Sequence, residues 1–332
     1  MIQRSVMFMQ PGRVQIQQKQ LGPPGRGQVL VRTMISAIST GTERLIFQGQ
    51  APADLALDEG ISALQGSFHY PFVYGYCLIG EVVELGAGVE QGWLGKQVFS
   101  FHPHENLFIT APDQLQPLPN GMSPERAVFF PNMETAVNFI QDGRPMLGEK
   151  VAVYGLGIVG LLTGSLLLQF PVDAVGFDLN PSRCAAAKNM GLPVKNLSAD
   201  GGDSGGMDEF DLGYELSGSP AALDALIQKV RFSGRIVIGS WYGTKSAVLS
   251  LGGRFHRNRI ELVSSQVSSI HPALSGRWDK QRRYQLVWEM LERVQPEKWI
   301  THRFPLSEAQ SAYAMIANPP EDFIQSIFTY DD

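Results

Sequence analysis

The chain has 332 residues, of which 44% are hydrophobic and 18% charged, with 35 glycines and 21 prolines. This composition excludes a disordered chain, a coiled coil and a collagen-like repeat, and the length predicts about two domains. The formal net charge of -5 argues against a dedicated nucleic-acid-binding protein. Two cysteines are too few for a disulfide framework or for a four-cysteine zinc lobe.

The first 120 residues are predicted to form a compact β-rich domain. Strand-like composition occurs at 28–37, 80–85 and 97–101, and turn-forming segments such as PPGRG at 23–27 separate these runs. The N-terminal residues show neither the continuous apolar stretch nor the cleavage site of a signal peptide. We therefore expect a cytoplasmic protein.

From Ser123 onward the sequence alternates between strands and helices. Ser123 and Pro124 have the residue types preferred at a helix N-cap and first helical position, and Glu134 to Gln141 continues in helical style. The predicted strands are 151–154, 174–178, 211–216 and 235–239, and the predicted helices are 158–169, 181–190 and 220–231. This alternation indicates an α/β fold with a parallel, doubly wound sheet.

The segment after Trp299 returns to a mixed pattern, with a helix capped at Ser307 and a final strand in FIQSIFTYD. We therefore expect one domain made of residues 1–122 and 290–332, and a second made of residues 123–289.

Residues 151–170 form a stretch of 20 residues without a charge, which is the length of a membrane span. A buried strand, a glycine turn and a buried helix would give the same composition. We favour the second interpretation, because a membrane span needs no glycines at fixed offsets.

These glycines form the pattern G-x-G-x-x-G at Gly155, Gly157 and Gly160. In a strand–turn–helix context, the first glycine permits the tight turn, the second lets the backbone approach a pyrophosphate, and the third lets the helix pack closely on the strand. The free N–H groups of Ile158 and Val159, at the start of the helix, would bind the phosphates.

Asp178 ends the next predicted strand, where a carboxylate accepts hydrogen bonds from a ribose 2′-OH and repels a 2′-phosphate. This favours NAD, with NADH preferred, although Arg183 could accept a 2′-phosphate and NADP is not excluded. The alternative is an ordinary glycine-rich turn followed by a surface aspartate.

Nearly the whole chain resembles the medium-chain dehydrogenase/reductase superfamily, which includes alcohol dehydrogenases and quinone oxidoreductases. The matching segments are GYCLIGEVVELGAGV at 75–89, PNGMSPERAVFF at 119–130, LGEKVAVYGLGIVGLL at 147–162 and FDLGYELSGSPAALDALIQKVRFSGRIVIGSWYG at 210–243. AISTGTER at 37–44 also resembles a narrower branch, the bacteriochlorophyllide dehydrogenase-like proteins.

The resemblance implies a GroES-like catalytic domain, a Rossmann domain and an active site in the cleft between them. It adds Ser217 and Gly239 to the cofactor-binding residues. It also implies a homodimer formed through an edge strand of the Rossmann sheet, for which VSSQVSS at 263–269 is the candidate.

The sequence differs from the zinc-dependent members of the superfamily at the positions of the zinc ligands. The resemblance places Ser39 where they have a cysteine, Tyr76 where they have a histidine, and Cys77 at the following glutamate, and the third ligand falls near Pro131. A hydroxyl and a phenol are not usual zinc ligands. We therefore expect a protein without zinc.

Without zinc, hydride transfer to a carbonyl needs positioned proton donors. The resemblance places Ser39, Thr40, Tyr76 and Glu134 near the nicotinamide. Tyr76 is the candidate acid, or a wall residue that fills the space left by the metal. Glu134 could orient a hydroxyl or the carboxamide, or cap a helix.

Other polar residues have both functional and structural interpretations. His102 and His104 could share a metal or form hydrogen bonds within a loop, and Glu43 could simply pair with Arg44. Cys77 could be a nucleophile or a small wall residue, whereas Cys184 is expected to pack in the interior.

The segment 48–74 is long for a connection and is expected to shape the substrate entrance, with a short helix in ADLALDEGISAL. A decorative surface loop is the alternative. Aromatic residues of a wide apolar pocket, or of the ordinary core, are Phe47, Phe68, Tyr70, Phe72 and Tyr74. We expect a bulky, largely apolar small-molecule substrate and neither nucleic acid nor membrane as a partner.

Two classes of function follow. The first is a zinc-independent NAD(H)-dependent oxidoreductase that acts on an alcohol/carbonyl pair or on an activated C=C bond. The second is a dinucleotide-binding sensor or scaffold protein that has lost catalysis.

Overall fold

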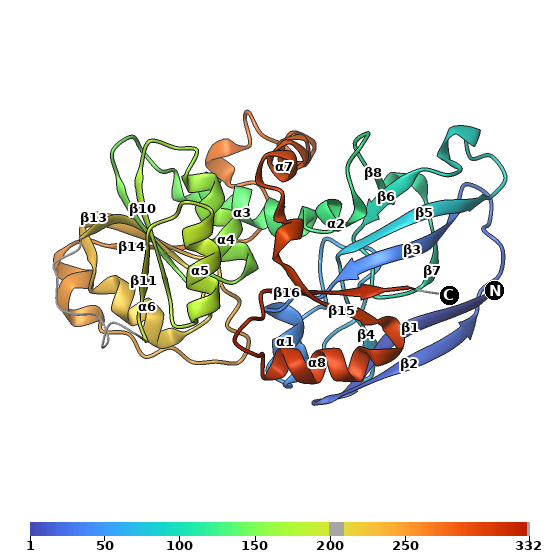
Figure 1. The fold of residues 1–332 in the computed structure, drawn as a ribbon, viewed down its shortest axis with the longest axis horizontal. Coiled ribbons are helices and arrows are strands. Elements are labelled where there is room, and N and C mark those ends of the chain that lie inside the picture. The colour runs from blue at the N-terminus through green and yellow to red at the C-terminus, as the bar shows by residue number, and fades with distance from the viewer. Residues whose placement is uncertain (199–208, 331–332) are drawn as a thin grey trace. The chain divides into compact units, whose positions relative to one another are not determined.

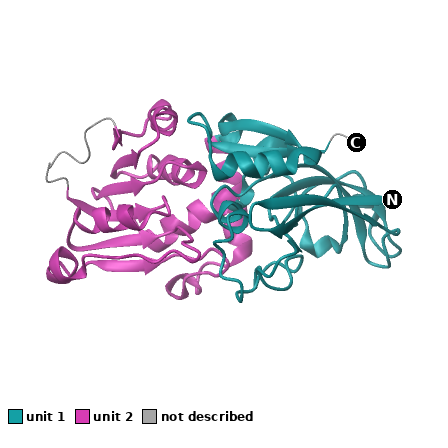
Figure 2. Ribbon diagram, turned by 90° about the horizontal axis from the view of Figure 1, so that it is seen from below, with its two compact units in different colours: residues 1–131, 295–332 teal, residues 132–294 magenta. Residues whose placement is uncertain are grey.

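A computed structural model describes residues 1–198 and 209–330. The chain divides into two compact units, residues Met1–Pro131 with Gln295–Asp332 (unit 1) and residues Asn132–Val294 (unit 2) (Figure 2). The boundary lies inside helix α3 (Phe130–Gly143), later than the expected position at 122/123. Unit 2 is continuous in sequence, whereas unit 1 is built from two separate segments.

Unit 1 is dominated by antiparallel β-structure (Figure 1). Its strands are β1 (Ile2–Gln10), β2 (Arg13–Gln20), β3 (Val29–Ala37), β4 (Phe72–Val73), β5 (Leu78–Leu85), β6 (Gln97–Ser100), β7 (Leu107–Thr110), β8 (Gln116–Pro117), β15 (Ile300–Pro305) and β16 (Gln325–Thr329). Its helices are α1 (Thr42–Phe47), α2 (Pro124–Ala127) and α8 (Ala309–Ala317). The predicted strands at 28–37, 80–85 and 97–101 are confirmed as β3, β5 and β6, whereas β1 and β2 were not predicted.

Strand β3 is the centre of unit 1. A seven-stranded sheet has the order β15-β16-β3-β5-β6-β8, with β7 also pairing with β3, and a second sheet has the order β2-β1-β4. The inner faces of β3 and β5 bury Val29, Val31 and Val82 against Phe108. Strand β16 enters this sheet from the distant second segment of the unit.

Unit 2 is a doubly wound parallel sheet, which confirms the predicted fold class. Its strands are β9 (Lys150–Tyr154), β10 (Asp173–Asp178), β11 (Val194–Asn196), β12 (Phe210–Glu215), β13 (Val230–Ile238) and β14 (Glu261–Ser264). Its helices are α3, α4 (Ile158–Leu167), α5 (Pro181–Asn189), α6 (Pro220–Ile227) and α7 (Lys280–Val294). The strand order β11-β10-β9-β12-β13-β14 is that of a Rossmann fold.

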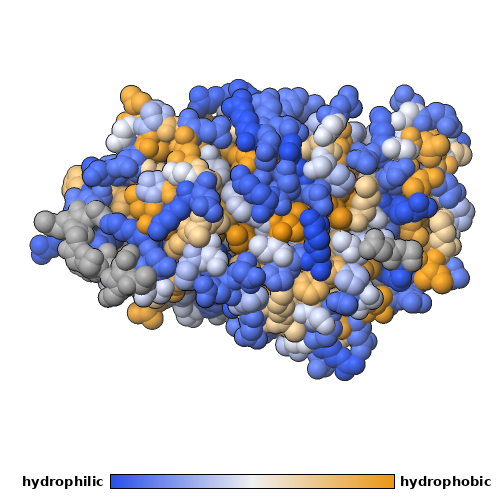
Figure 3. Space-filling model, viewed as in Figure 1, coloured by the Kyte–Doolittle hydropathy of each residue, from blue (hydrophilic) through white to orange (hydrophobic). Residues whose placement is uncertain are grey.

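The apolar stretch 151–170 forms β9, a glycine turn and α4, so the membrane-span interpretation is wrong. Within the described ranges, we find no helix with the length and apolar character needed to cross a bilayer. On the face shown in Figure 3, apolar residues form small groups among polar ones.

Two predicted helices differ from the structure. Helix α8 begins at Ala309, and Ser307 lies in a preceding 3-10 turn instead of capping the helix. Residues 53–64 form turns and bends instead of a helix. The physical reason is local, because the Asp58 carboxylate accepts hydrogen bonds from the N–H groups of Gly60 and Ile61 and fixes a turn.

Two further elements have different bounds. Helix α6 ends at Ile227 instead of residue 231, and β13 already begins at Val230. The candidate strand 263–269 is β14 only as far as Ser264. Beyond it, the Gln266 side chain accepts a hydrogen bond from the Ser268 N–H and supports a turn.

Candidate active site

The glycine turn between β9 and α4 has the geometry of a dinucleotide-binding loop. Gly155 has a φ of +95°, and a Cβ there would lie 2.6 Å from the Ser217 nitrogen. A Cβ on Gly160 would lie 1.9 Å from the carbonyl oxygen of Gly155, whereas a Cβ on Gly157 would meet no atom within 4 Å. Gly155 and Gly160 are therefore required by the fold itself, and Gly157 borders open space.

Helix α4 starts directly at this space. Gly157 is its N-cap and provides no side-chain cap, and Ile158 and Val159 are the first helical residues. The first N–H groups of a helix have no partner within the helix and carry the positive end of its dipole. The turn thus offers an anion-binding position suited to a pyrophosphate.

Asp178 lies beside the glycine turn at the end of β10. Its carboxylate accepts hydrogen bonds from Leu156 N–H at 2.6 Å and from Asn180 N–H at 2.8 Å. A carboxylate has about four acceptor positions, so capacity remains for ribose hydroxyls. Arg183 lies in the first turn of α5, and its buried Nε has no hydrogen-bond partner among the described residues.

Ser217 and Gly239 follow the neighbouring strands β12 and β13. The Ser217 hydroxyl and N–H both donate to Glu215, which is fully buried. Tyr242 OH donates to the same carboxylate at 2.8 Å. A Cβ on Gly239 would lie 2.3 Å from the Phe139 ring, so this glycine has a packing role. Sequence reasoning missed Glu215, because one acidic residue ending an apolar strand has no distinctive spacing.

The structure brings Tyr76 and Ser39 together in unit 1. The Tyr76 hydroxyl donates a hydrogen bond of 2.5 Å to Ser39 Oγ, and both residues are half-buried. Ser39 follows β3, and Tyr76 precedes β5, which pairs with β3 in antiparallel register. Adjacent strands therefore position the two side chains, which we call the Tyr76–Ser39 dyad. Thr40 is also half-buried and follows Ser39 directly.

The Tyr76 phenol is held in its protonated form. Burial raises its pKa well above the ordinary value for tyrosine, and the charge of Glu43 acts in the same direction. Hydrogen bonds with Ser39 and Thr42 oppose this shift without cancelling it. The phenol therefore carries its proton at neutral pH.

A buried pair of polar side chains, Glu43 and His104, is connected to this dyad through Ser39. Glu43 and His104 are both fully buried, with Glu43 Oε2 at 3.0 Å from His104 Nε2. The Glu43 Oε1 accepts a hydrogen bond of 2.7 Å from Ser39 N–H, and Tyr313 OH donates to Oε2. The interpretation that Glu43 simply pairs with Arg44 is wrong. His104 is hydrogen-bonded, as the structural interpretation predicted.

Glu134 belongs to unit 2 and is already paired. It lies inside α3, so its interpretation as a helix cap is wrong. Its carboxylate is buried, at 2.5 Å from Lys280 Nζ and 3.5 Å from Arg283 Nη1. Burial raises the pKa of Glu134, and the two cations oppose that shift. This cluster ties α3 to α7.

The donor set of unit 1 does not suit a catalytic zinc ion. At the two positions implied by the resemblance, the hydroxyl and the phenol bond to each other. The Cys77 thiol is buried and donates to the Val128 carbonyl oxygen at 2.9 Å, and burial raises its pKa well above the usual value. Zinc takes thiolate, imidazole or carboxylate ligands. No group of three or more His, Cys, Asp and Glu side chains in the described ranges could hold a metal ion.

Most of the aromatic residues assigned to a pocket belong to the core. Phe47, Phe68, Phe72 and Tyr74 are at most 8% exposed. Phe72 packs against Phe8 at a ring distance of 5.7 Å. The structure thus supports their interpretation as core for these four, whereas Tyr70 is half-buried and bonds to the Ile46 carbonyl. Cys184 is buried, as expected.

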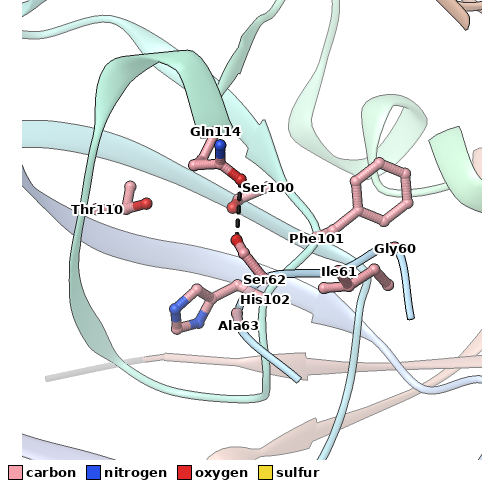
Figure 4. Close-up of a pocket in the computed structure, with 9 residues that line it drawn as sticks. All are labelled: Gly60, Ile61, Ser62, Ala63, Ser100, Phe101, His102, Thr110 and Gln114. Atoms are coloured by element: carbon pink, nitrogen blue, oxygen red, sulfur yellow. Dashed lines mark hydrogen bonds between the residues drawn. The ribbon is translucent and has the colours of Figure 1, made fainter. Parts of the chain in front are cut away.

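A small cavity of about 60 Å³ lies between the segment 48–74 and strands of unit 1 (Figure 4). The Ser62 hydroxyl donates to Gln114 across it at 2.9 Å. Its lining residues are Gly60, Ile61, Ser62, Ala63, Ser100, Phe101, His102, Thr110 and Gln114. Sites for bulky ligands usually measure roughly 300–1,000 Å³, so this cavity does not hold a bulky substrate.

Comparisons with known proteins agree with this architecture. D-guloside 3-dehydrogenase of Escherichia coli K12 is 24% identical over 323 residues, covering 90% of this chain and 89% of that protein. An alcohol dehydrogenase of Escherichia coli CFT073 complexed with NADH superposes with a TM-score of 0.78 at 17% identity, covering 99% of each chain. A zinc-binding dehydrogenase of Sinorhizobium meliloti 1021 bound to NADP gives a TM-score of 0.77 at 17% identity, also covering 99% of each chain. No protein-family model matches the chain.

The fold and the glycine turn define a two-unit protein with a Rossmann-type second unit, and the proteins to which it is similar are dehydrogenases. The proteins similar to this chain are dehydrogenases, and its sequence motifs resemble those of the medium-chain dehydrogenase/reductase superfamily.

Proposed function

We propose that this protein is a zinc-independent NAD(H)-dependent oxidoreductase that transfers hydride between nicotinamide and a bulky alcohol/carbonyl substrate, or an activated C=C bond. The observation that carries the proposal is the Tyr76–Ser39 hydrogen bond, which joins two positions where the resemblance implies zinc ligands in zinc-dependent proteins. The dinucleotide turn at Gly155, Gly157 and Gly160 supports the cofactor assignment.

The proposed chemistry assigns a role to each candidate residue. When bound, NADH supplies the hydride that adds to the electrophilic carbon. Tyr76 donates its phenolic proton to the developing alkoxide, or to the enolate after C=C reduction, and Ser39 orients the phenol. Thr40 offers a second hydroxyl, and Glu134 orients groups near the nicotinamide through its ion-paired carboxylate.

The test is NADH consumption by the purified protein with a panel of bulky and small ketones, aldehydes and enones. We expect turnover in protein purified without added metal, with well under one zinc per chain and no loss on chelation. Stoichiometric zinc that supports activity would overturn zinc independence. NADH binding without turnover on any substrate would favour the sensor or scaffold, which the dehydrogenase relatives do not favour.

We expect NADH to bind more tightly than NADPH. Loss of a charge-assisted hydrogen bond to Asp178 costs roughly 1.5–3 kcal/mol, or about tenfold to a hundredfold in affinity. Fluorescence titration of both cofactors measures the ratio, and Asp178→Asn should bring the two affinities closer. A preference for NADPH that survives Arg183→Ala would contradict the assignment.

We also propose a homodimer formed through the Rossmann sheet. Strand β14 lies at one end of the sheet order, and an unpaired edge is a template for pairing with a second copy. Light scattering at micromolar concentration should give twice the mass of one chain. A monomer at that concentration rejects the dimer.

Segment 48–74 is proposed to select the substrate by size. Leu57 and Leu64 are buried and anchor it, so residues 58–63 can be replaced by a short glycine linker without removing these anchors. We expect unchanged NADH affinity and a smaller ratio of kcat/KM between bulky and small substrates. If a folded variant keeps the parental ratio of kcat/KM between bulky and small substrates, the segment has no role in substrate selection.

A further inference from the structure

In the buried pair Glu43–His104, every polar side-chain atom is hydrogen-bonded. Glu43 is fully buried, and its two carboxylate oxygens contact His104, Tyr313 and the Ser39 N–H. His104 is also fully buried, and its Nδ1 lies 2.6 Å from Ser36 Oγ. Each polar atom of the pair therefore has a partner inside unit 1.

Such a pair is not explained by stability alone. Burying polar side chains costs free energy unless each is hydrogen-bonded, and well-packed apolar residues often stabilise a core equally well. A buried, fully hydrogen-bonded polar network can instead fix one geometry of the surrounding groups. In this network, the groups that are fixed are those that bond to Glu43.

The backbone of Ser39 is bonded to Glu43 at both of its polar groups. Glu43 Oε1 accepts from Ser39 N–H at 2.7 Å, and Glu43 N–H donates to the Ser39 carbonyl oxygen at 2.9 Å. Both backbone polar groups of Ser39 thus bond to one residue. His104 and Tyr313 hold the carboxylate from the other side, and Tyr313 comes from the distant helix α8.

We propose that Glu43 is a positioning residue, held by His104 and Tyr313, which fixes the Ser39 backbone so that the Ser39 hydroxyl aligns the Tyr76 phenol for proton donation. This inference rests on the proposed function. Its alternative is a capping role, in which the Glu43 carboxylate only satisfies the start of α1. A cap alone requires neither the buried imidazole nor the bond from Tyr313.

The direct test compares Glu43→Ala and Glu43→Gln. The glutamine keeps an acceptor for the Ser39 N–H, whereas the alanine removes it. Misplacing a catalytic group by about 1 Å costs on the order of a hundredfold in rate. We expect Glu43→Ala to lower kcat at least tenfold with unchanged NADH affinity, and Glu43→Gln to recover most of the loss.

A matched control is Glu105→Gln. Glu105 is another buried carboxylate of unit 1, bonded to Gln3 at 2.7 Å instead of to Ser39. Glu105→Gln should keep the parental kcat. Equal losses of kcat in Glu43→Ala and Glu105→Gln would overturn the proposal in favour of general destabilisation.

A double variant separates positioning from a structural role. If Glu43 acts through Tyr76, Glu43→Ala should add little to the loss caused by Tyr76→Phe, whereas independent effects would multiply. Multiplying effects would overturn the proposal. Parental kcat in folded Glu43→Ala would also overturn it, while parental kcat in Tyr76→Phe would instead refute Tyr76 as the acid.

Hydrogen exchange at the Ser39 amide provides a readout that needs no turnover. We expect faster exchange in Glu43→Ala and near-parental exchange in Glu43→Gln. If the protein turns over no substrate, the proposed function fails and the role of Glu43 in that reaction fails with it. Hydrogen exchange at the Ser39 amide then still tests whether Glu43 binds this N–H. An unchanged exchange rate in Glu43→Ala would refute the hydrogen bond between Ser39 N–H and Glu43.

Discussion

Replacing Tyr76 with phenylalanine is expected to lower the rate of NADH-dependent reduction by roughly a hundredfold to ten-thousandfold, which is the usual contribution of a positioned general acid. The variant removes only the hydroxyl that bonds to Ser39 Oγ. NADH affinity should stay at the parental value, because the glycine turn belongs to unit 2. Single-turnover measurement of NADH oxidation isolates the chemical step from product release.

Tyr74→Phe is the matched control for this experiment. Tyr74 is 4% exposed and its ring lies 6.1 Å from that of Tyr76, but it is not assigned to the dyad. The control should therefore retain most of the activity. If Tyr76→Phe matches the parent in a single turnover, Tyr76 is a wall residue and the acid must be sought elsewhere.

The pH dependence follows from the same hydroxyl. Because burial raises the pKa of Tyr76 above the ordinary tyrosine value, the donating, protonated form persists throughout the neutral and mildly alkaline range. Deprotonation of Tyr76 should therefore cause no loss of reduction rate between about pH 6 and 9. A fall in that range that disappears in Tyr76→Phe would contradict this assignment.

The second large effect concerns the glycine turn, where two alanine substitutions should have opposite consequences. Gly157→Ala should leave the free energy of unfolding within about 0.5 kcal/mol of the parental value, because its Cβ meets no atom within 4 Å and its φ of -63° suits alanine. It should nevertheless weaken NADH binding by on the order of a hundredfold, because the methyl group occupies the space that the pyrophosphate needs.

Gly160→Ala is the contrasting variant. Its Cβ would lie 1.9 Å from the Gly155 carbonyl oxygen, so the turn must shift. Such overpacking usually costs about 1–3 kcal/mol of stability. Chemical denaturation measures this loss, and NADH titration measures binding. If Gly157→Ala binds NADH as the parent does, the turn is not the pyrophosphate site.

The sequence predicted unit 2 well, because its signals are local. The alternation of strands with helices defines a parallel sheet, and Gly155, Gly157 and Gly160 have fixed positions within one turn. Errors occurred where a side chain bonds to a nearby backbone group, as Asp58 and Gln266 do. Such bonds end or replace an element without changing the hydrophobic pattern.

The candidate active site was less accessible to sequence reasoning. Ser39 and Tyr76 were found through resemblance, and their direct hydrogen bond was not predicted. Glu43, His104 and Tyr313 are far apart in the sequence, with separations of 61 and 270 residues between bonded partners. No periodicity predicts such a meeting, because the packing of helices α1 and α8 and of the segment between β6 and β7 creates it.

Strand β16 also determines the order in which the molecule can assemble during synthesis. It lies between β15 and β3, yet residues 325–329 leave the ribosome after all of unit 2 has been made. Unit 2 is continuous, so it can fold first, at a stage when β3 still lacks its neighbouring strand β16. Tyr313 belongs to the same C-terminal segment, so it is also synthesised after unit 2. A nascent chain can thus acquire its dinucleotide turn before Glu43 has all its partners.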